Sequence, residues 1–299
     1  MNCQDQIYSE EYIDFIGNRS LIESKYTLDC KQPLGARFAS LYLKLSDGYE
    51  DGTVYGYYNI PKLFGLQDTG SMESSGILQV RENPYLKLDG SGVLIGFVDT
   101  GIDYAGSIFL KQDGTTRVTA IWDQTIPAGS PIRLPAQPEL PETPENITRT
   151  PEGFLYGSEF THEQLNAAVK MADAYEGISS RDENGHGTFL ASIAAGNELP
   201  DGSFTGAAPK ADIAMVKLKP AKNRLRAYYQ IKEDAVAYQE NDIMAGVLYL
   251  VSLAKKRQQP LVICLGLGTN AGSHRGGLPL ARMLEELGSS VGITIVAGT

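Results

Sequence analysis

Two residues, an aspartate and a histidine, stand in sequence contexts in which each could take part in acid–base catalysis. Asp99 ends the apolar run of "VLIGFVDTGIDY", and His186 lies between Gly185 and Gly187 in "DENGHGTFLASIAAG". An aspartate can fix the tautomer of an imidazole, and that imidazole can take a proton from a serine hydroxyl. The two residues therefore suggest nucleophilic catalysis, with a serine as the third member.

The elements expected around these residues place them where catalytic groups usually lie. In an open parallel sheet, chemistry collects at the carboxyl ends of strands, and Asp99 ends an expected strand. The stretch "TFLASIAAG" is typical of a helix of small residues that ends at Gly196, so His186 should project from the helix N-terminus. We expect the Asp99 carboxylate to lie within ~4 Å of the His186 imidazole.

Each residue also has a structural interpretation. Asp99 could cap its own turn through its carboxylate, and His186 could be packed beneath a turn. A second Asp-Thr-Gly begins at Asp68, so an aspartic protease with two carboxylates sharing a proton is another alternative. No apolar strand precedes Asp68, and the surrounding sequence indicates an α/β fold rather than an all-β fold, which disfavours this alternative.

The distribution of apolar runs predicts two regions. The first ~70 residues mix helix-like and strand-like segments, which is typical of a small α+β unit. From Leu78 onward, apolar runs without polar alternation alternate with helical stretches, which favours an α/β fold with a parallel sheet covered by helices on both faces. Residues 127–153 are rich in proline and should form an irregular surface insertion. After it, Thr161 and Gln164 form a capping-box pattern that predicts a helix, with His162 on its surface.

Composition restricts the partners and the location. The chain has 299 residues and a formal net charge of −10, so neither nucleic acid nor an anionic membrane is expected as its main partner. Its start, "MNCQDQIYSEEYIDF", lacks the pattern of a signal peptide, and no apolar run reaches ~18 residues, so we expect an intracellular protein. Cys3, Cys30 and Cys264 are too few and too scattered for a disulfide framework or a metal cluster, and we expect them to be reduced.

Four sequence blocks resemble, in the right order, those of the subtilisin-like serine proteases, from about Thr69 to Thr299. They are "GFVDTGIDY" for the aspartate block, "NGHGTFLASIAAG" for the histidine block, "TGAAPKADIAMVKLK" for the segment after it, and "VICLGLGTN" for the substrate-binding strand. Within this family, "IWDQTI" and "LGTNAGSH" most resemble the clostridial Csp germination proteases and their uncharacterised relatives. The resemblance implies a serine-type endopeptidase that acts on a protein or peptide substrate, in the cytoplasm or associated with the spore.

The resemblance also implies a domain organisation and a role for each candidate residue. Residues 1–68 would be an α+β propeptide that assists folding and inhibits the enzyme, and residues 69–299 would be the subtilisin-like catalytic domain. Asp99 would orient His186, and His186 would act as general base and then as general acid. No cofactor is implied, and a structural calcium ion is left open.

Substrate binding would fall to a short strand after the apolar run that contains Cys264. Its backbone would pair with an extended peptide as an added strand, and the residues that carry this role over are Leu265, Gly266, Leu267 and Gly268. The family usually has Ser-Leu-Gly at the last three positions, and the glycine at 266 costs rigidity. Residues 221–242 would replace a short family loop and restrict which substrates enter. Cys264 would be a core residue.

The largest departure from the family concerns the nucleophile. No "GTS" followed by a small-residue helix occurs, and the sequence stops at "ITIVAGT", which resembles the strand leading to the oxyanion-hole asparagine. The serines at 71, 74 and 75 fall in the expected propeptide junction, and Ser192 lies on the histidine helix. We therefore expect a chain truncated before its catalytic serine and inactive by itself. Two functions stay open: an endopeptidase with its serine beyond Thr299, and a pseudoprotease that acts as a binding or regulatory module.

Overall fold

The computed structural model describes most of the chain. The described residues are 2–25, 30–44, 59–66, 85, 88–135, 147–200, 204–272 and 275–298. Several positions of interest lie outside them, namely Asp68, Ser71, Ser74, Ser75, the expected boundary between residues 68 and 69, and residues 136–146 of the insertion.

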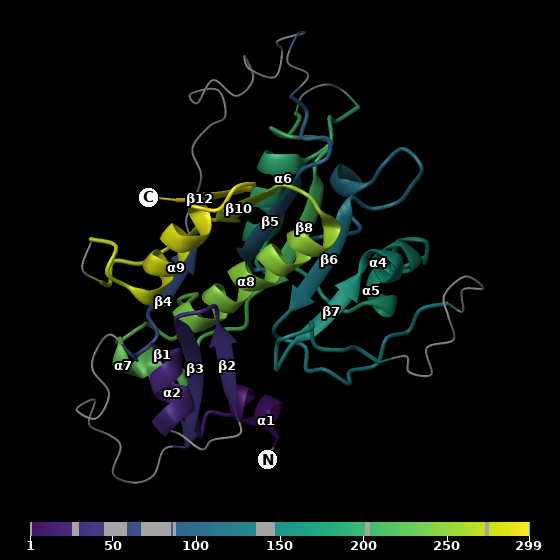
Figure 1. The fold of residues 1–299 in the computed structure, drawn as a ribbon. Helices are drawn as coiled ribbons and strands as arrows, with labels where there is room; N and C mark the ends of the chain where they lie inside the picture. The colour runs from purple at the N-terminus through teal and green to yellow at the C-terminus, as the bar shows by residue number, and fades with distance from the viewer. Residues whose placement is uncertain are drawn as a thin grey trace.

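A six-stranded sheet forms the centre of the C-terminal region, residues 88–298 (Figure 1), in the order β12-β10-β5-β8-β6-β7. Its strands are β5 (Leu94–Asp99), β6 (Val118–Asp123), β7 (Ser158–Thr161), β8 (Asp212–Lys217), β10 (Leu261–Leu265) and β12 (Ile293–Ala297). The first five strands in the sheet order are mutually parallel, and β7 pairs antiparallel with β6. This arrangement confirms the predicted α/β fold.

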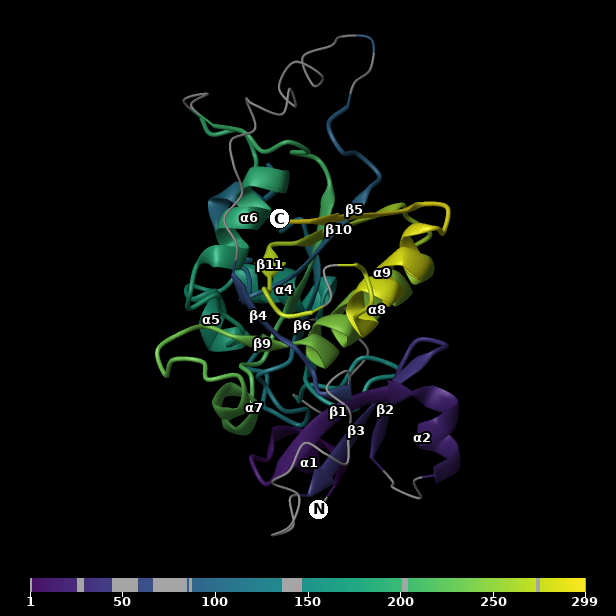
Figure 2. The same cartoon turned by 90° about the vertical axis from the view of Figure 1, so that its left-hand side faces the viewer.

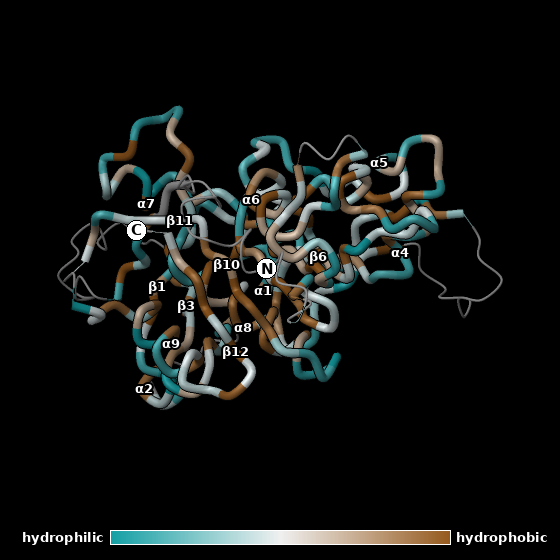
Figure 3. Tube along the Cα trace, turned by 90° about the horizontal axis from the view of Figure 1, so that it is seen from above, coloured by the Kyte–Doolittle hydropathy of each residue, from teal (hydrophilic) through white to brown (hydrophobic). Residues whose placement is uncertain are grey.

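Helices cover both faces of this sheet. They are α4 (His162–Val169), α5 (Ala174–Gly177), α6 (His186–Ala195), α8 (Glu240–Arg257) and α9 (Pro279–Gly288), with a short 3-10 helix at Ser107–Phe109. The remaining helix of this part, α7 (Asn223–Tyr228), packs instead against N-terminal residues such as Phe15 and Leu41 through Leu225. In β5, Leu94 and Val98 pack on the face covered by α8 and α9, and Ile95 and Phe97 pack on the face covered by α4 and α6. The strand is apolar throughout because both of its faces are buried, and Figure 3 shows hydrophobic residues gathered along the central strands.

The N-terminal region forms a separate antiparallel sheet in the order β1-β3-β2. Its elements are α1 (Cys3–Tyr8), β1 (Tyr12–Asn18), α2 (Arg19–Lys25), β2 (Lys31–Leu34) and β3 (Phe38–Lys44). We call this part the N-terminal unit, and it has the α+β character that the sequence predicts. Its lower position in Figure 1 places it against one end of α8 and beside α7.

A third sheet joins the two regions. Strand β4 (Leu63–Leu66) lies between β11 (Leu267–Gly268) and β9 (Tyr238–Gln239), antiparallel to both (Figure 2). Leu66 faces Leu267 and Gly65 faces Gly268 in this register. A segment from the first 68 residues is therefore paired with two strands of the C-terminal region.

The expectation of three reduced cysteines is wrong for two of them. Cys3 and Cys30 form a disulfide with a Cα–Cα distance of 5.1 Å, and Cys264 is free. The bond ties α1 to the start of β2 across 27 positions of sequence. An isolated pair of this kind lacks the cysteine spacing pattern of disulfide-rich domains, so the sequence did not predict the bond.

Two surface assignments also need correction. In the proline-rich insertion, the described parts contain only isolated bridges such as Pro131 with Ile147, as expected, but Ile132 is 5% exposed and packs into the core beside α4 and α5. His162 begins α4 after the Thr161 cap, and its Nε2 lies 3.0 Å from the carbonyl oxygen of Thr116. That ring is part-buried and bonded to the backbone, not simply displayed to solvent.

Membrane-spanning helices and clusters of metal-binding side chains are both absent from the described residues. No helix among them is both long enough and apolar enough to cross a membrane. In the same part of the chain, no three His, Cys, Asp or Glu side chains gather in a group that could hold a metal ion.

The disulfide should contribute measurably to stability. Replacing Cys3 and Cys30 by serine is expected to lower the free energy of unfolding of the N-terminal unit by about 3–4 kcal/mol, because a cross-link over a loop of this length restricts the unfolded chain. Urea unfolding with and without dithiothreitol measures the effect. Cys264→Ser, which keeps the Cys3–Cys30 bond, is the control and should lose stability in dithiothreitol to the same extent as wild type. Equal midpoints for the oxidised and reduced wild type would contradict the prediction.

Candidate active site

The carboxylate of Asp99 and the imidazole of His186, the two groups predicted from the sequence, lie in direct contact. Asp99 is the last residue of β5 and is 1% exposed, and its Oδ1 lies 2.8 Å from His186 Nδ1. The same oxygen accepts a hydrogen bond of 2.7 Å from the backbone N–H of Thr100. The expected proximity of Asp99 and His186 is confirmed, and it excludes a role for Asp99 in capping alone.

The first turn of α6 holds the imidazole in place. Gly185, the N-cap residue of the helix, has a φ of +87° and, as a glycine, has no side chain that could cap the helix. Asp182 supplies the missing acceptor: its oxygens accept the backbone N–H groups of Gly185 and Thr188 at 2.9 and 2.8 Å, and the Thr188 hydroxyl at 2.7 Å. Asp182 therefore satisfies helix N–H groups that would otherwise lack partners beside His186.

A threonine links this turn to the end of β5. The hydroxyl of Thr100 donates to Asp182 Oδ1 at 2.7 Å and accepts the backbone N–H of Gly187 at 2.9 Å. Burial alone would raise the pKa of Asp182, but the hydrogen bonds from Thr188, Thr100 and Gly185 outweigh burial and lower it. Asp182 is therefore a stable carboxylate at neutral pH.

A buried lysine fixes the loop that carries Asp182. Lys217, the last residue of β8, lies opposite Asp99 of β5 in the register of the sheet. Its Nζ donates to the carbonyl oxygen of Arg181 and to Glu183 Oε2, both at 2.6 Å. The same ammonium lies 3.9 Å from Asp123 Oδ2 at the end of β6. The carboxyl ends of three adjacent strands thus present Asp99, Lys217 and Asp123 in one row, with the loop before α6 held above them.

The negative charge of Asp99 affects two neighbours. Burial, and then the charge of Asp99, raise the pKa of the Cys264 thiol to about 11. The same two causes, with further contributions from Asp182 and Glu183, raise the pKa of Tyr238 well above its ordinary value. Cys264 is therefore a thiol at neutral pH, which argues against its acting as the nucleophile.

The four residues expected to bind peptide belong to different strands. Leu265 belongs to β10 and faces Ala297 in the central sheet, whereas Leu267 and Gly268 form β11 and pair with β4. Gly266 lies between the two strands and packs against Asp99 and His186: a Cβ there would stand 3.1 Å from His186 Cε1 and 3.3 Å from Asp99 Oδ2.

Residue 266 is glycine, where serine was expected from the resemblance to the family, and the reason is steric. A Cβ at Gly266 would lie 2.2 Å from Cδ1 of Leu190, which is 2% exposed in α6. Leu190 therefore occupies the space that a side chain at 266 would need. Glycine at this position leaves no gap in the packing, because the side chain of Leu190 fills the space.

Residues 221–242 pack against the N-terminal unit and against residues beside β4. They contain α7, β9 and the start of α8, and they pack against the N-terminal unit through apolar side chains. Those of the segment are Ala221, Leu225 and Ala237, and the cluster also holds Phe15 of the N-terminal unit and, beside or in β4, Ile60 and Leu63. The segment that was expected to restrict substrates thus also contacts the N-terminal unit.

Comparison with known proteins places these features in a family. A model of the Subtilase family matches residues 90–293, which include Asp99 and His186, so the chain belongs to the subtilase family. The subtilisin-like protease SBT3.8 of Arabidopsis thaliana is 30% identical over 144 residues, covering 43% of this chain and 16% of that protein. SBT3.5 of the same plant is 28% identical over 168 residues, covering 53% of this chain and 19% of that protein.

A solved structure gives the same assignment. The structure of the Clostridium perfringens CspB protease is similar with a TM-score of 0.56 and 27% sequence identity. The similarity covers 76% of this chain and 40% of that one. The chain thus spans less than half the length of these relatives.

Sequence reasoning missed several residues of the site. Asp182 was visible as an acidic residue three positions before Gly185, where it could accept N–H groups of a helix start, and Thr100 follows Asp99 directly. Nothing in the sequence indicated that Lys217 would reach the loop at Arg181 or that Leu190 would fill the space at Gly266, because both contacts join distant segments.

Asp182 should stabilise the site in a pH-dependent way. Asp182→Asn is expected to lower the free energy of unfolding by about 2–3 kcal/mol at pH 7, because it replaces a charged acceptor of several hydrogen bonds. The folded-state pKa of Asp182 is lowered. Its contribution should therefore be complete above about pH 5 and disappear as pH falls below about 4.

Urea unfolding of wild type and Asp182→Asn between pH 3 and 7 measures this difference. Glu198→Gln, an exposed acidic position away from the helix start, is the control. A wild-type advantage of the same size at pH 3 and pH 7 would show that the charge of Asp182 is not what stabilises the turn.

The pair of Leu190 and Gly266 should be energetically coupled. Gly266→Ser alone is expected to cost about 1–3 kcal/mol, because the new Cβ overlaps Leu190. Adding Leu190→Val should recover part of that cost, since it removes the overlapping methyl group. Thermal or urea unfolding of the two single variants and the double variant gives the coupling energy, and strictly additive effects would refute the steric explanation.

Proposed function

We propose that the protein is a serine-type endopeptidase of the subtilisin class that cleaves a protein substrate, with Asp99 and His186 as two members of its catalytic triad. The observation that carries the proposal is the 2.8 Å contact between His186 Nδ1 and Asp99 Oδ1, at the start of α6 and beside Gly266. Membership of the subtilase family supports the same chemistry.

The contact defines how the proton would move. With Nδ1–H donating to Asp99, a neutral imidazole presents Nε2 as a proton acceptor. Nε2 of His186 takes the proton of a serine hydroxyl while the serine oxygen attacks the carbonyl carbon of the substrate, and it later gives that proton to the leaving amine. Asp99 remains ionised and stabilises the imidazolium. The proposal places the serine and the oxyanion-hole asparagine outside residues 1–299, and it uses no cofactor.

Strand β11 would bind the substrate through its backbone. Leu267 and Gly268 would pair with an extended peptide as they now pair with Leu66 and Gly65 of β4. We infer that residues 1–68 act as a propeptide and that β4 inhibits by holding the position of a substrate strand. Removal of β4 would follow a cut in the residues that come after Leu66.

The proposed location is the cytoplasm or the spore. Disulfides persist poorly where thiols are kept reduced, so the bond between Cys3 and Cys30 favours the spore over the cytoplasm. The proposed partners are a protein substrate and the chain's own N-terminal unit, with neither nucleic acid nor membrane among them.

The catalytic role is tested on a longer form of the protein that includes the residues after Thr299. His186→Ala should slow cleavage between Leu66 and about residue 75 by three or more orders of magnitude, since triad members contribute on that scale. Intact mass and N-terminal sequencing measure the cleavage. His162→Ala, a histidine bonded only to a backbone carbonyl, is the matched control and should cleave normally.

Labelling with a fluorophosphonate separates the remaining alternatives. The longer form should be labelled at one serine, and residues 1–299 alone should not be labelled. Stoichiometric labelling of the 299-residue chain, or wild-type cleavage by His186→Ala, would contradict the proposal. A longer form that is folded yet neither labelled nor cleaved would identify the protein as a pseudoprotease.

A further inference from the structure

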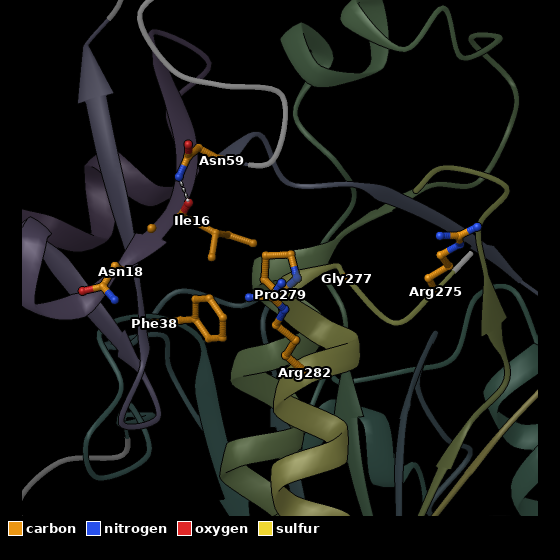
Figure 4. A pocket seen from close by; sticks show the side chains of 9 residues that line it. Ile16, Asn18, Phe38, Asn59, Arg275, Gly277, Pro279 and Arg282 are labelled. Atoms are coloured by element: carbon orange, nitrogen blue, oxygen red, sulfur yellow. Dashed lines mark hydrogen bonds between the residues drawn. The ribbon is translucent and has the colours of Figure 1, made fainter. Parts of the chain in front are cut away.

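A cavity of about 440 Å³ lies between the N-terminal unit and α9, apart from the catalytic pair (Figure 4). The N-terminal unit contributes Ile16, Gly17, Asn18 and Phe38, the segment leading to β4 contributes Asn59, and the C-terminal region contributes Arg275, Gly277, Pro279 and Arg282. This volume is large enough for a small organic molecule. Neither Asp99 nor His186 lines it, so the cavity is a separate feature from the proposed active site.

The charge of the cavity is opposite to that of the protein. The chain has a formal net charge of −10, yet the cavity lining contains two arginines and no acidic residue. Among the described residues, no carboxylate lies within ion-pair distance of Arg275 or Arg282, whereas Arg37 beside the cavity pairs with Glu286 at 3.4 Å. Two cationic side chains are thus left available for an anion, and a guanidinium binds carboxylates well.

Apart from Asn18 and Asn59, the rest of the lining carries no polar side chain, and it contains the start of a helix. Figure 4 shows the side chain of Arg282 reaching toward the N-terminal unit, near Phe38 and Pro279. Ile16 is 1% exposed, and Pro279 is the first residue of α9, a helix without a side-chain cap. Apolar walls beside a guanidinium suit a ligand that has an apolar body and a negative end.

We propose that this cavity binds a small organic anion, a carboxylate or a sulfonate with an apolar body. The anionic group lies at Arg282, with Arg275 as a second positive charge, and the apolar body contacts Ile16 and Phe38. Because both regions of the chain line the cavity, the ligand binds only while the N-terminal unit is attached. Binding therefore stabilises the attached state by mass action.

A fluorescent anion tests the proposal directly. Wild type should bind 8-anilinonaphthalene-1-sulfonate at one site, and octanoate should displace it while octanol, which has no charge, should not. Arg282→Gln should weaken binding of the dye about tenfold, the loss expected for one charge-assisted hydrogen bond. Arg133→Gln, which removes an exposed positive charge away from the cavity, should bind as wild type does.

The thermal midpoint of each protein gives a second readout and shows that the variants are folded. Octanoate should raise the midpoint of wild type and of Arg133→Gln but not that of Arg282→Gln. Equal dye affinity in wild type and Arg282→Gln, equal losses in the two arginine variants, or displacement by octanol would each overturn the proposal. Neither readout depends on peptide hydrolysis, so the result stands apart from the test of the catalytic role.

Discussion

The close approach of β5 to α6 is the constraint on which the site depends. A Cβ on Gly187 would lie 2.2 Å from the carbonyl oxygen of Gly101, so no other residue fits between the strand end and the helix start. Gly101 itself has a φ of +131° and is packed against the backbone at Arg181 and Asp182. Any side chain at either position would push the two segments apart. Such a shift would lengthen the hydrogen bond between Asp99 and His186 beyond the usual distance of a hydrogen bond.

Buried charges between the two regions give β4 its register. Asp14 of β1 is fully buried, pairs with Lys222, and accepts hydrogen bonds from Gln239 and Asn241 at 2.9 and 3.0 Å. Such buried polar contacts add little net stability, but a slip of the interface would leave them unpaired at high cost. Since Gln239 also belongs to β9, the same contacts fix the strand that pairs with β4.

The local sequence pattern and the strand topology predicted that Asp99 and His186 would lie together, but not the contacts that hold the surrounding segments in place. Asp99 and His186 could be placed because an apolar strand ends at one and a small-residue helix begins at the other, and parallel strands bring such ends together. The pairing of Leu63–Leu66 with β9 and β11 could not be read from the sequence, because antiparallel pairing over such distances leaves no local signal. The bond between Cys3 and Cys30 was missed for the same reason.

The position of β4 determines what must happen before another peptide can occupy this surface. β4 uses the backbone groups of β11 on one side and of β9 on the other, so a peptide that pairs with both strands must displace it. Lys62, the residue before β4, is fully buried, and its backbone exchanges hydrogen bonds with Glu240 at the start of α8. Displacing β4 therefore requires disrupting the interface beside it as well. A peptide that pairs with both strands thus needs this interface opened first, whereas the contact between Asp99 and His186 is already formed with β4 in place.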